Sequence, residues 1–457
     1  MGESDLSGGK RYTGKLLFRM GVVCLRTIMN NRWSKWLLAG LMPALLAACG
    51  INGSSGNGSE KANGDEGAKS DGPANLVFYS TAVWSQEAFN ERFGDAIRKK
   101  FPNYTVQAIF NGKGTSFEDV MSSGVTIDIV WQDVNNTIPE LLNYGLQYDM
   151  TELIKKYGVP VQNLEPTAIN AIREMSDGKL YALPIVNNTA VLYYNKDLFD
   201  KFGVPYPTDG MTWDQAIDLA KRLYRSDGGV QYYGMRGGIQ PHANLSPLSI
   251  PSIDPKTGKP TLLTDDRWKT LFSEVVEMKK TVENKALSFV KDPKVAMSLD
   301  LANIFINNDM SALNWDLVSY PAYKDKPGVG PQALPTLFGI TSASKQKDEA
   351  MKVLSYLLSV EAQMSFSERA VIPILQNEQV KGAFGKNSPY KNKNLQSIVK
   401  TKFAPITSKS KFEGNIRTIY DKAIPDLVDG KVDLNTAFRS MDEQINKLIA
   451  EDKMKSK

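Results

Sequence analysis

The sequence predicts an α/β protein whose sheets are covered by helices on both faces. Short apolar runs typical of buried strands alternate along the chain with segments whose apolar residues recur at helical spacing. This alternation favours mainly parallel sheets. A chain of 457 residues, 42% of them apolar, is long enough for two domains with a core each.

The first elements follow in this order from residue 76. Strands are predicted at residues 76–80, 104–110 and 127–131. Between the first two, residues 86–101 place five apolar side chains on one helical face. Thr115 and Glu118 have the spacing of a capping box, which predicts that a helix starts there.

The same alternation resumes after Tyr181. Residues 191–195 resemble a strand, and Thr212 with Gln215 forms a second capping box that opens an amphipathic helix. Helices are predicted in the C-terminal third at residues 347–358, 414–427 and 434–449. The sequence therefore predicts two α/β domains with a helical C-terminal part.

Cys49 lies directly behind a short apolar run, in the sequence LAACG. Arg32 and Lys35 precede the apolar stretch 36–45, and small residues precede the cysteine, as in a secretory signal. The pattern resembles the lipobox of bacterial lipoproteins, in which the cysteine is lipidated and becomes the mature N-terminus. The run is shorter than the roughly 20 residues of a membrane-spanning helix. We therefore expect a protein on the outer, extracytoplasmic face of the cell membrane, attached only through the lipid on Cys49.

Two segments flank the cysteine. Residues 1–48 are interpreted as the signal region, with 1–28 as an extension ahead of a second candidate start at Met29. Residues 49–74, crowded with Gly, Ser, Asn and charged residues, are predicted to form a flexible tether. Such a segment buries too little apolar surface to offset its ordering entropy.

The positive charge of the chain belongs to the signal region. Residues 1–48 hold seven of the 55 Lys and Arg and two of the 50 Asp and Glu, so the remaining chain has equal numbers of both signs. This balance argues against a nucleic-acid partner, which usually requires a basic domain or stripe. Cys24, the only other cysteine, is also removed with the signal, so the mature domain depends on its hydrophobic core.

A composite pattern then points to a known family. It consists of DIVW at 128–131, DGKLYALP at 177–184, NNTAVLYYNKDLF at 187–199 and SKQKDEA at 344–350. In this chain order, behind a lipobox, these segments resemble the family 1 extracellular solute-binding proteins of ABC importers, the group that contains maltose-binding protein. The resemblance covers residues 75–457.

The resemblance implies a two-lobed fold of the periplasmic-binding-protein type. Lobe 1 would comprise residues 75–188 and about 338–370, and lobe 2 about 190–337 and about 374–457. The chain would cross between the lobes near 188–190, 338–340 and 369–373. The implied function is to capture a small solute by hinge closure and deliver it to an ABC permease, as a monomer without cofactor, metal or catalytic residues.

The candidate ligand-binding residues are those that could reach a solute between the lobes. They are Trp84, Trp131, Asp133, Asn187, Asn188, Tyr193, Arg236, Trp315 and Asp316. Trp84 and Trp131 follow or end predicted strands, where loops converge on ligands in open α/β sheets. By resemblance, Trp315 would stack on a sugar from lobe 2. Core packing is the alternative for each tryptophan.

The other candidates have alternatives of their own. Asn187 and Asn188 stand at the expected hinge, where turn chemistry is an equal explanation. Tyr193 and Tyr194 alternate on one strand, so only one of them can face the cleft. Arg236, in a glycine-rich loop, could grip a carboxylate or hydroxyl, but a solvated surface position is the commoner fate.

The solute is expected to be a carbohydrate, first of all an oligosaccharide, because of the aromatic residues and the family's commonest cargo. A peptide, polyol or uronate would fit nearly as well. A surface-anchored carbohydrate hydrolase and a receptor for a membrane sensor kinase are the competing functions. The sequence gives little support to a catalytic function, since His242 is the only histidine and no spacing typical of a zinc site occurs.

Overall fold

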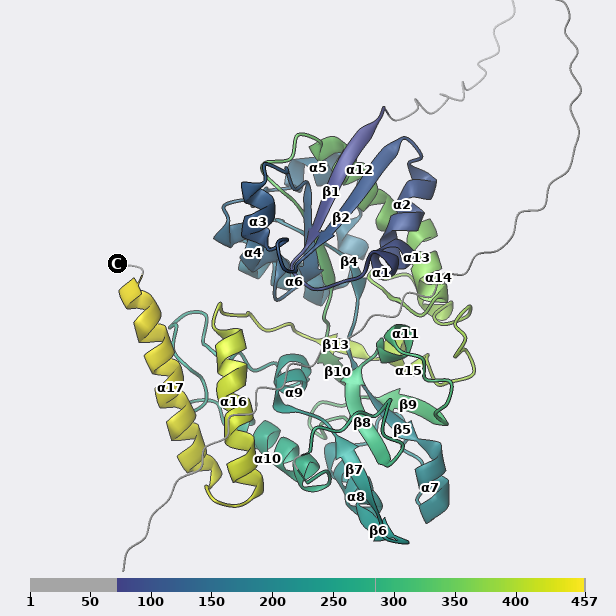
Figure 1. Cartoon of the computed structure of the whole chain (residues 1–457), viewed down its shortest axis with the longest axis vertical. Coiled ribbons are helices and arrows are strands. Elements are labelled where there is room, and N and C mark those ends of the chain that lie inside the picture. Colours follow the sequence, from purple (N-terminus) through teal and green to yellow (C-terminus); the bar gives the residue numbers. More distant parts are fainter. Residues whose placement is uncertain (1–71, 284, 456–457) are drawn as a thin grey trace, which may run out of the picture. The chain divides into compact units, whose positions relative to one another are not determined.

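Two β-sheets organise the chain, one in each of two lobes (Figure 1). The computed structural model describes residues 72–283 and 285–455. Cys49, the signal region and the predicted tether up to residue 71 lie outside the described residues. We call the part around the six-stranded sheet lobe 1 and the part around the five-stranded sheet lobe 2.

The sheet of lobe 1 has the strand order β12-β4-β11-β3-β1-β2. Its strands are β1 (Ala74–Ser80), β2 (Tyr104–Phe110), β3 (Ile129–Asp133), β4 (Leu183–Asn187), β11 (Thr336–Ile340) and β12 (Ile372–Pro373). β1 runs parallel to β2 and β3, whereas β11 is antiparallel to both of its neighbours. The sheet is therefore mixed, which corrects the expectation of mainly parallel sheets.

The sheet of lobe 2 has the order β6-β7-β8-β5-β9. Its strands are β5 (Ala190–Asn195), β6 (Arg225–Asp227), β7 (Val230–Arg236), β8 (Val295–Leu301) and β9 (Trp315–Ser319), and β10 (Val329–Gln332) pairs separately with β13 (Lys402–Ala404). Only β7 and β8 are parallel in the five-stranded sheet. Antiparallel pairing again dominates.

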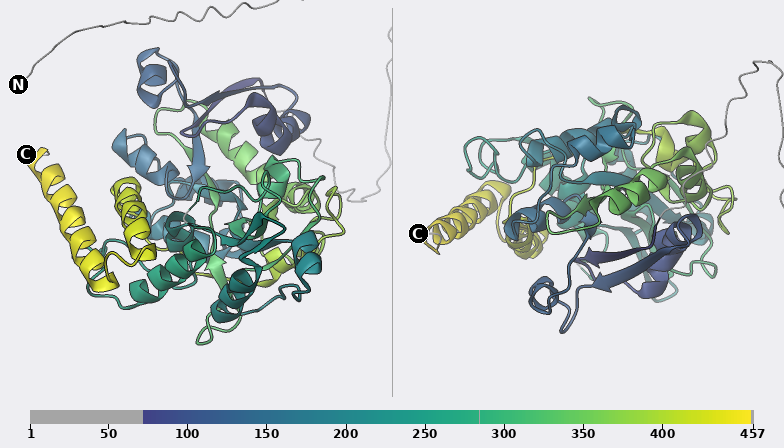
Figure 2. Two further views of the ribbon diagram at one scale, coloured as in Figure 1. Left: turned by 60° about the horizontal axis from the view of Figure 1, so that its bottom comes forward. Right: turned by 90° about the horizontal axis from the view of Figure 1, so that it is seen from above.

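Helices cover both sheets. Those of lobe 1 are α1 (Gln86–Phe89), α2 (Asp95–Lys100), α3 (Phe117–Ser122), α4 (Thr137–Asn143), α5 (Thr151–Lys156), α6 (Pro166–Met175), α12 (Lys347–Leu357), α13 (Val360–Glu368) and α14 (Glu378–Gly382), with a 3₁₀ turn at Val161–Asn163. Those of lobe 2 are α7 (Lys196–Phe202), α8 (Trp213–Leu223), α9 (Ile239–Leu245), α10 (Arg267–Lys280), α11 (Ile304–Asn307), α15 (Ser397–Lys400), α16 (Glu413–Val428) and α17 (Leu434–Lys455). The last two lie side by side in Figures 1 and 2 and pack on α10.

The inner strands of each sheet are buried on both faces, so their alternating side chains enter two different apolar clusters. In β1, Phe78 packs into one apolar cluster and Tyr79 into another on the opposite face. In β5, Leu192 and Tyr193 divide in the same way between two clusters of lobe 2. Successive side chains of a strand point to opposite faces, so covering both faces buries both sets.

Helix boundaries follow local chemistry, with two corrections. The capping box at Thr212 and Gln215 is confirmed at the start of α8. The one predicted at Thr115 begins one residue later, with Ser116 as the N-cap and Asp119 as its partner. Thr115 Oγ1 instead donates to the Phe110 carbonyl at 2.8 Å, which closes the turn after β2.

The predicted helix 86–101 is interrupted by a π-helical turn. The turn spans Asn90–Gly94, between α1 and α2, and the Asp95 N–H donates to the Asn90 carbonyl five residues back. One residue more per turn shifts the side chains that follow around the helix axis. Such turns occur frequently at functional sites.

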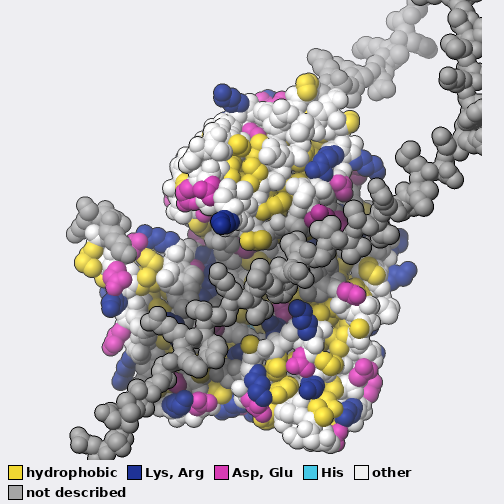
Figure 3. All heavy atoms as spheres, in the orientation of Figure 1, with side chains coloured by type: hydrophobic (Ala, Val, Ile, Leu, Met, Phe, Trp, Pro, Cys, Tyr) yellow, Lys and Arg dark blue, Asp and Glu magenta, His cyan; other side chains and the backbone are white. Residues whose placement is uncertain are grey.

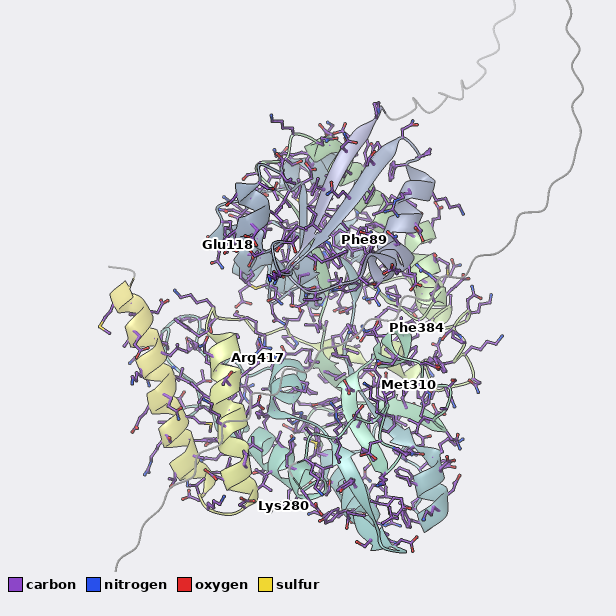
Figure 4. All side chains as sticks on the ribbon, viewed as in Figure 1. Phe89, Glu118, Lys280, Met310, Phe384 and Arg417 are labelled. Carbon is purple, nitrogen blue, oxygen red and sulfur yellow. The ribbon has the colours of Figure 1, made fainter. Side chains whose placement is uncertain are left out.

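The chain passes between the lobes at three places. The first passage is residues 188–189, between β4 and β5, and the second is 333–335, ahead of β11 and a few residues before the predicted position. The third begins near the predicted position 369–373, where Ala370 and Ile372 pack in an apolar cluster of lobe 2, but Ile374 and Val380 pack in the core of lobe 1 before the chain continues beyond α14. Beyond α14, Phe384 belongs to the same apolar cluster of lobe 2 as Met310; both are labelled in Figure 4.

His242 belongs to a buried polar network in lobe 2. Its Nε2 lies 2.9 Å from Glu274 Oε2, and the hydroxyl of Tyr323 donates to the same oxygen at 2.7 Å. Its Nδ1 is bonded to the hydroxyl of Tyr320. Both ring nitrogens are thus engaged within the core, which gives the only histidine a structural role.

Gly234 of β7 lies in close contact with helix α8. A Cβ there would collide with the carbonyl oxygen of Ala220 in α8 and come within 2.8 Å of Thr281 Cβ. We expect Gly234→Ala to lower the free energy of unfolding by about 1–3 kcal/mol, measured by denaturant unfolding. Gly414→Ala, where no atom lies within 4 Å of the new Cβ, is the matched control and should be neutral or mildly stabilising. Equal unfolding midpoints for the two variants would contradict the expectation.

Candidate functional site

Two adjoining cavities lie between the lobes. The larger has a volume of about 860 Å³ and the smaller about 170 Å³. The residues that line both are Trp84, Arg92, Asn303, Ile306 and Val371. These residues come from lobe 1, from lobe 2 and from the chain just before β12, so the cavities form one cleft, which we call the interlobe cleft.

Trp84 forms the aromatic wall of the cleft. It lies in the loop that follows β1, and its half-buried ring packs edge-on against Trp131 at a centroid distance of 4.9 Å. The guanidinium carbon of Arg92 lies 5.1 Å from the centroid of the Trp84 ring. Val83 beside it is 83% exposed and also lines the larger cavity. The loop thus presents apolar surface to the cleft at the carboxyl end of β1, as expected for open α/β sheets.

Asp133 supplies a carboxylate at the end of β3. Its Oδ1 accepts hydrogen bonds from the Asn135 N–H at 2.8 Å and from Asn136 Nδ2 at 2.9 Å. Burial raises the pKa of this carboxyl, although those bonds act in the opposite direction. Asp133 lines the smaller cavity, where a solute hydroxyl could donate to its carboxylate.

Asn187 and Asn188 form the floor at the first passage between the lobes. Asn187 Oδ1 accepts from the Asn188 N–H at 2.9 Å, and Asn188 Oδ1 accepts from the Thr189 N–H at 2.9 Å. The Nδ2 of Asn187 is buried and has no acceptor in the described part of the chain. A buried amide donor left unpaired costs free energy, and here it belongs to a residue that lines the smaller cavity.

Lobe 2 contributes the opposite wall through α11 and the residue before it. Asn303 follows β8, and Ile306 and Asn307 lie on the helix. Arg92 Nη2 lies 3.5 Å from Asn307 Oδ1, a long contact across the cleft. Amides and an aliphatic side chain therefore face Trp84 from the second lobe.

The structure brings together four of the nine predicted site residues. Trp84, Asp133, Asn187 and Asn188 line the cleft. Trp131 does not, because it is fully buried in the core of lobe 1 among Phe89, Phe93 and Phe338. Figure 4 shows Phe89 within that lobe. Trp131 reaches the site only through its contact with the Trp84 ring.

Trp315 and Tyr193 are buried in lobe 2 instead of facing a solute. They pack on each other at a ring distance of 5.6 Å, and neither has exposed surface. Tyr194, its neighbour on β5, points into the other apolar cluster. The expectation that one of the two tyrosines faces the cleft is therefore wrong in this structure, because helices cover both faces of the sheet.

Arg236 and Asp316 are held by partners within lobe 2. Arg236 Nη1 donates to Asp300 Oδ2 at 2.6 Å and lines a separate cavity of about 390 Å³. Asp316 Oδ1 accepts from the backbone N–H groups of Leu317 at 2.9 Å and Asn394 at 2.8 Å. Both residues tie strands to neighbouring segments of lobe 2.

Sequence reasoning missed Arg92, Asn303, Ile306, Asn307 and Arg369. Asn303 could have been found, because it follows a strand of lobe 2 as Trp84 follows a strand of lobe 1. Arg92 carries no local signal, since it lies within a predicted helix whose π-helical turn is not visible in the pattern.

We expect the burial of Asp133 to reduce stability at neutral pH. A raised pKa means that the folded chain takes up a proton more readily than the unfolded chain, so stability falls as the pH rises through the folded pKa. Asp133→Asn keeps the acceptor oxygen without the charge. Thermal unfolding measured from acid to neutral pH should show that the stability of the variant rises relative to that of the wild type as the pH rises. A difference independent of pH would contradict this.

Other features of the described residues define the rest of the molecule. Along 72–283 and 285–455, no helix is long and apolar enough to cross a membrane. Within the same ranges, no three His, Cys, Asp or Glu side chains are grouped so that they could hold a metal ion. Lys and Arg are intermixed with Asp and Glu over the face shown in Figure 3.

Comparison with known proteins gives the same architecture. In a solved structure, an ABC substrate-binding protein of Listeria monocytogenes in complex with cycloalternan matches with a TM-score of 0.66 and 18% identity, over 83% of this chain and 99% of that one. A sugar transporter protein of Rhizobium etli in an open conformation matches with a TM-score of 0.64 and 20% identity, over 81% and 99%. At these identities the likeness concerns the fold.

Among curated sequences, a candidate binding protein of Brucella abortus is 25% identical over 259 residues, half of this chain. The matched region spans 59% of that relative's length. The family model of bacterial extracellular solute-binding proteins matches residues 82–364, more than half of the chain. This chain belongs to the bacterial extracellular solute-binding proteins.

Proposed function

We propose that the protein is the solute receptor of an ABC importer and that it binds a sugar or polyol in the interlobe cleft. The observation that carries the proposal is the makeup of the cleft. The interlobe cleft is lined by the half-buried ring of Trp84, the carboxylate of Asp133 and Asn187, whose buried amide donor is unpaired. Sugars present apolar ring faces and hydroxyl groups, which these residues complement.

The relatives support a carbohydrate. The Listeria structure holds cycloalternan, and the Rhizobium protein is described as a sugar transporter. The cleft of this chain offers a single tryptophan ring and a smaller cavity of about 170 Å³. A small sugar or polyol fits this smaller cavity better than a long oligosaccharide, which would extend into the larger cavity.

Solute binding would act through a hinge equilibrium and not through chemistry on the solute. A ligand that contacts both lobes favours the closed arrangement by its differential affinity for that state. The three passages between the lobes, at 188–189, at 333–335 and beyond α14, are the segments about which closure would occur. The closed form would then be presented to the permease.

Titration of intrinsic tryptophan fluorescence tests the proposal. Trp84 lines the cleft, so its emission should change when a solute binds, whereas Trp315 and Trp131 are fully buried. A panel of monosaccharides, oligosaccharides, polyols, amino acids and peptides should contain at least one saturating ligand. A folded protein that responds to none of them, by fluorescence or by calorimetry, would overturn the proposal.

We propose further that Cys49 carries the lipid that attaches the protein to the membrane. Cys49→Ala should release the mature protein from the membrane fraction or block its processing, because no other cysteine follows the signal region. Solute affinity should stay unchanged, since the cleft is built from residues beyond 82. Fractionation and a binding titration check the two halves, and loss of binding in a soluble, folded variant would contradict the second.

A further inference from the structure

The interlobe cleft holds two guanidinium groups. Arg92, in the π-helical turn, lines both cavities, and Arg369, just after α13, lines the larger one. Burial and the neighbouring charge of Arg369 lower the pKa of Arg92 to about 10. Burial also lowers the pKa of Arg369. Both arginines thus line one cavity, and the charge of Arg369 acts on Arg92.

Neither guanidinium is paired with a carboxylate in the described part of the chain. Arg369 donates only to backbone carbonyls, to Glu91 at 2.5 Å and to Ser365 at 3.2 Å. Arg92 has only the long contact to the Asn307 amide oxygen and its position over the Trp84 ring. By contrast, Arg98, one turn beyond the π-helical turn, is paired with Asp95 at 3.3 Å.

Two carboxylates line the same larger cavity as the two arginines, but neither is paired with them. Glu87 and Glu91 are exposed to solvent, and neither forms an ion pair with Arg92 or Arg369. The charge of Glu91 acts on both arginines only as a weaker, longer-range effect after burial. Asp133 lines the smaller cavity and is engaged by Asn135 and Asn136.

A third donor belongs to a residue that lines the smaller cavity. Asn187 is 5% exposed, its Nδ2 has no acceptor among the described residues, and it lines the smaller cavity together with Arg92. Two guanidinium groups without an ion pair in the described chain and one unpaired amide donor therefore line the cleft. Hydrogen bonds from such donors are strongest when the acceptor is an anion, and Arg suits carboxylate and phosphate because it can donate two parallel bonds.

We propose that the solute carries an anionic oxygen group, a carboxylate or a phosphate, which is held between Arg92 and Arg369 while its sugar or polyol body lies against Trp84. This inference rests on the proposed function, because it needs the interlobe cleft to be the solute site. The anion offsets the repulsion between the two like charges, and the amide of Asn187 donates to the oxygens of the solute. The π-helical turn that presents Arg92 to the cleft is thereby explained as part of the binding site.

Matched ligands test the proposal. The full-length mature protein is titrated with glucose, glucuronate and glucose 6-phosphate, and with glycerol and glycerol 3-phosphate, by tryptophan fluorescence at low and at moderate ionic strength. We expect at least one anionic member to bind tenfold or more tightly than its neutral partner, with affinity that falls as salt is added. The carboxylate and phosphate arms show which anion is preferred.

Substitutions assign the effect to the two arginines. Arg92→Gln and Arg369→Gln should each weaken binding of the anionic ligand by about 10- to 100-fold, as expected for a charged hydrogen-bond partner, and leave a neutral ligand within a few-fold. Arg92→Lys should restore part of the affinity. Arg222→Gln, on the exposed face of α8 in lobe 2, is the matched control and should bind as the wild type does.

The outcomes separate this proposal from the proposed function. If neutral sugars or polyols bind as tightly as their anionic partners, or if Arg92→Gln weakens both equally, the anion site is wrong and the solute receptor stands. If neither neutral nor anionic ligands from the wider panel bind the folded protein, both proposals fail.

Discussion

Replacement of Trp84 by alanine should abolish most of the solute affinity while leaving the fold intact. Trp84 is the only aromatic side chain found to line the interlobe cleft among the described residues. Truncating a central aromatic anchor typically costs 2 kcal/mol or more of binding free energy, which corresponds to a loss of about 30-fold in Kd. Isothermal calorimetry with the solute identified by titration measures this loss directly.

The stability of the Trp84→Ala variant should change much less. The ring is half-buried and lies at the edge of the core of lobe 1, so its removal should lower the free energy of unfolding by no more than about 1.5 kcal/mol. Trp84→Phe, which keeps a ring against the edge of Trp131, should recover part of the affinity. An alanine variant that is folded and binds like the wild type would show that the solute lies elsewhere.

Replacement of Trp131 by alanine should have the opposite effect, because it should mainly lower the stability of the protein. Trp131 is fully buried and contacts four aromatic rings, those of Trp84, Phe89, Phe93 and Phe338. Emptying such a site leaves a large cavity, and we expect the free energy of unfolding to fall by about 3–5 kcal/mol. Denaturant unfolding monitored by circular dichroism gives the value.

The matched variant is Trp131→Phe. The indole Nε1 of Trp131 has no hydrogen-bond partner among the described residues, so phenylalanine removes volume but no bond. Its cost should be about 1–2 kcal/mol. If Trp131→Ala unfolds like the wild type yet loses solute affinity, Trp131 is a ligand contact as the sequence first suggested, and the packing explanation is wrong.

The comparison between these two tryptophans shows where prediction from sequence succeeds and where it fails. The rule that ligands bind beyond the carboxyl ends of strands placed Trp84 correctly, because the loop after β1 lies at the edge of the cleft. The same rule misplaced Trp131, which is inside β3 and points to one of two buried faces. A strand pattern cannot tell a face covered by helices from one open to a solute.

The predictions that Trp315 and Tyr193 contact the solute failed for the same reason. Both belong to strands of lobe 2 whose two faces are packed into separate apolar clusters. The family resemblance suggested a stacking tryptophan near residue 315, but the ring at this position packs between Phe305 and Tyr390. A residue at a matching position can serve the core in one member of a family and the ligand in another.

By itself, the sequence determined the α/β class, the family, most of the strands and helices, and the position of Trp84, Asp133, Asn187 and Asn188 at strand ends or at the first passage. These properties depend on local periodicity and on chain order, which a sequence displays directly. Only the tertiary structure decided that Arg92, Asn303 and Arg369 share one cleft, since these residues are separated by 66 to 277 positions and meet only when both lobes have folded. The charge of the site also emerged only there, because an arginine's role depends on whether folding brings it a carboxylate, and Arg92 and Arg369 receive none within the described chain.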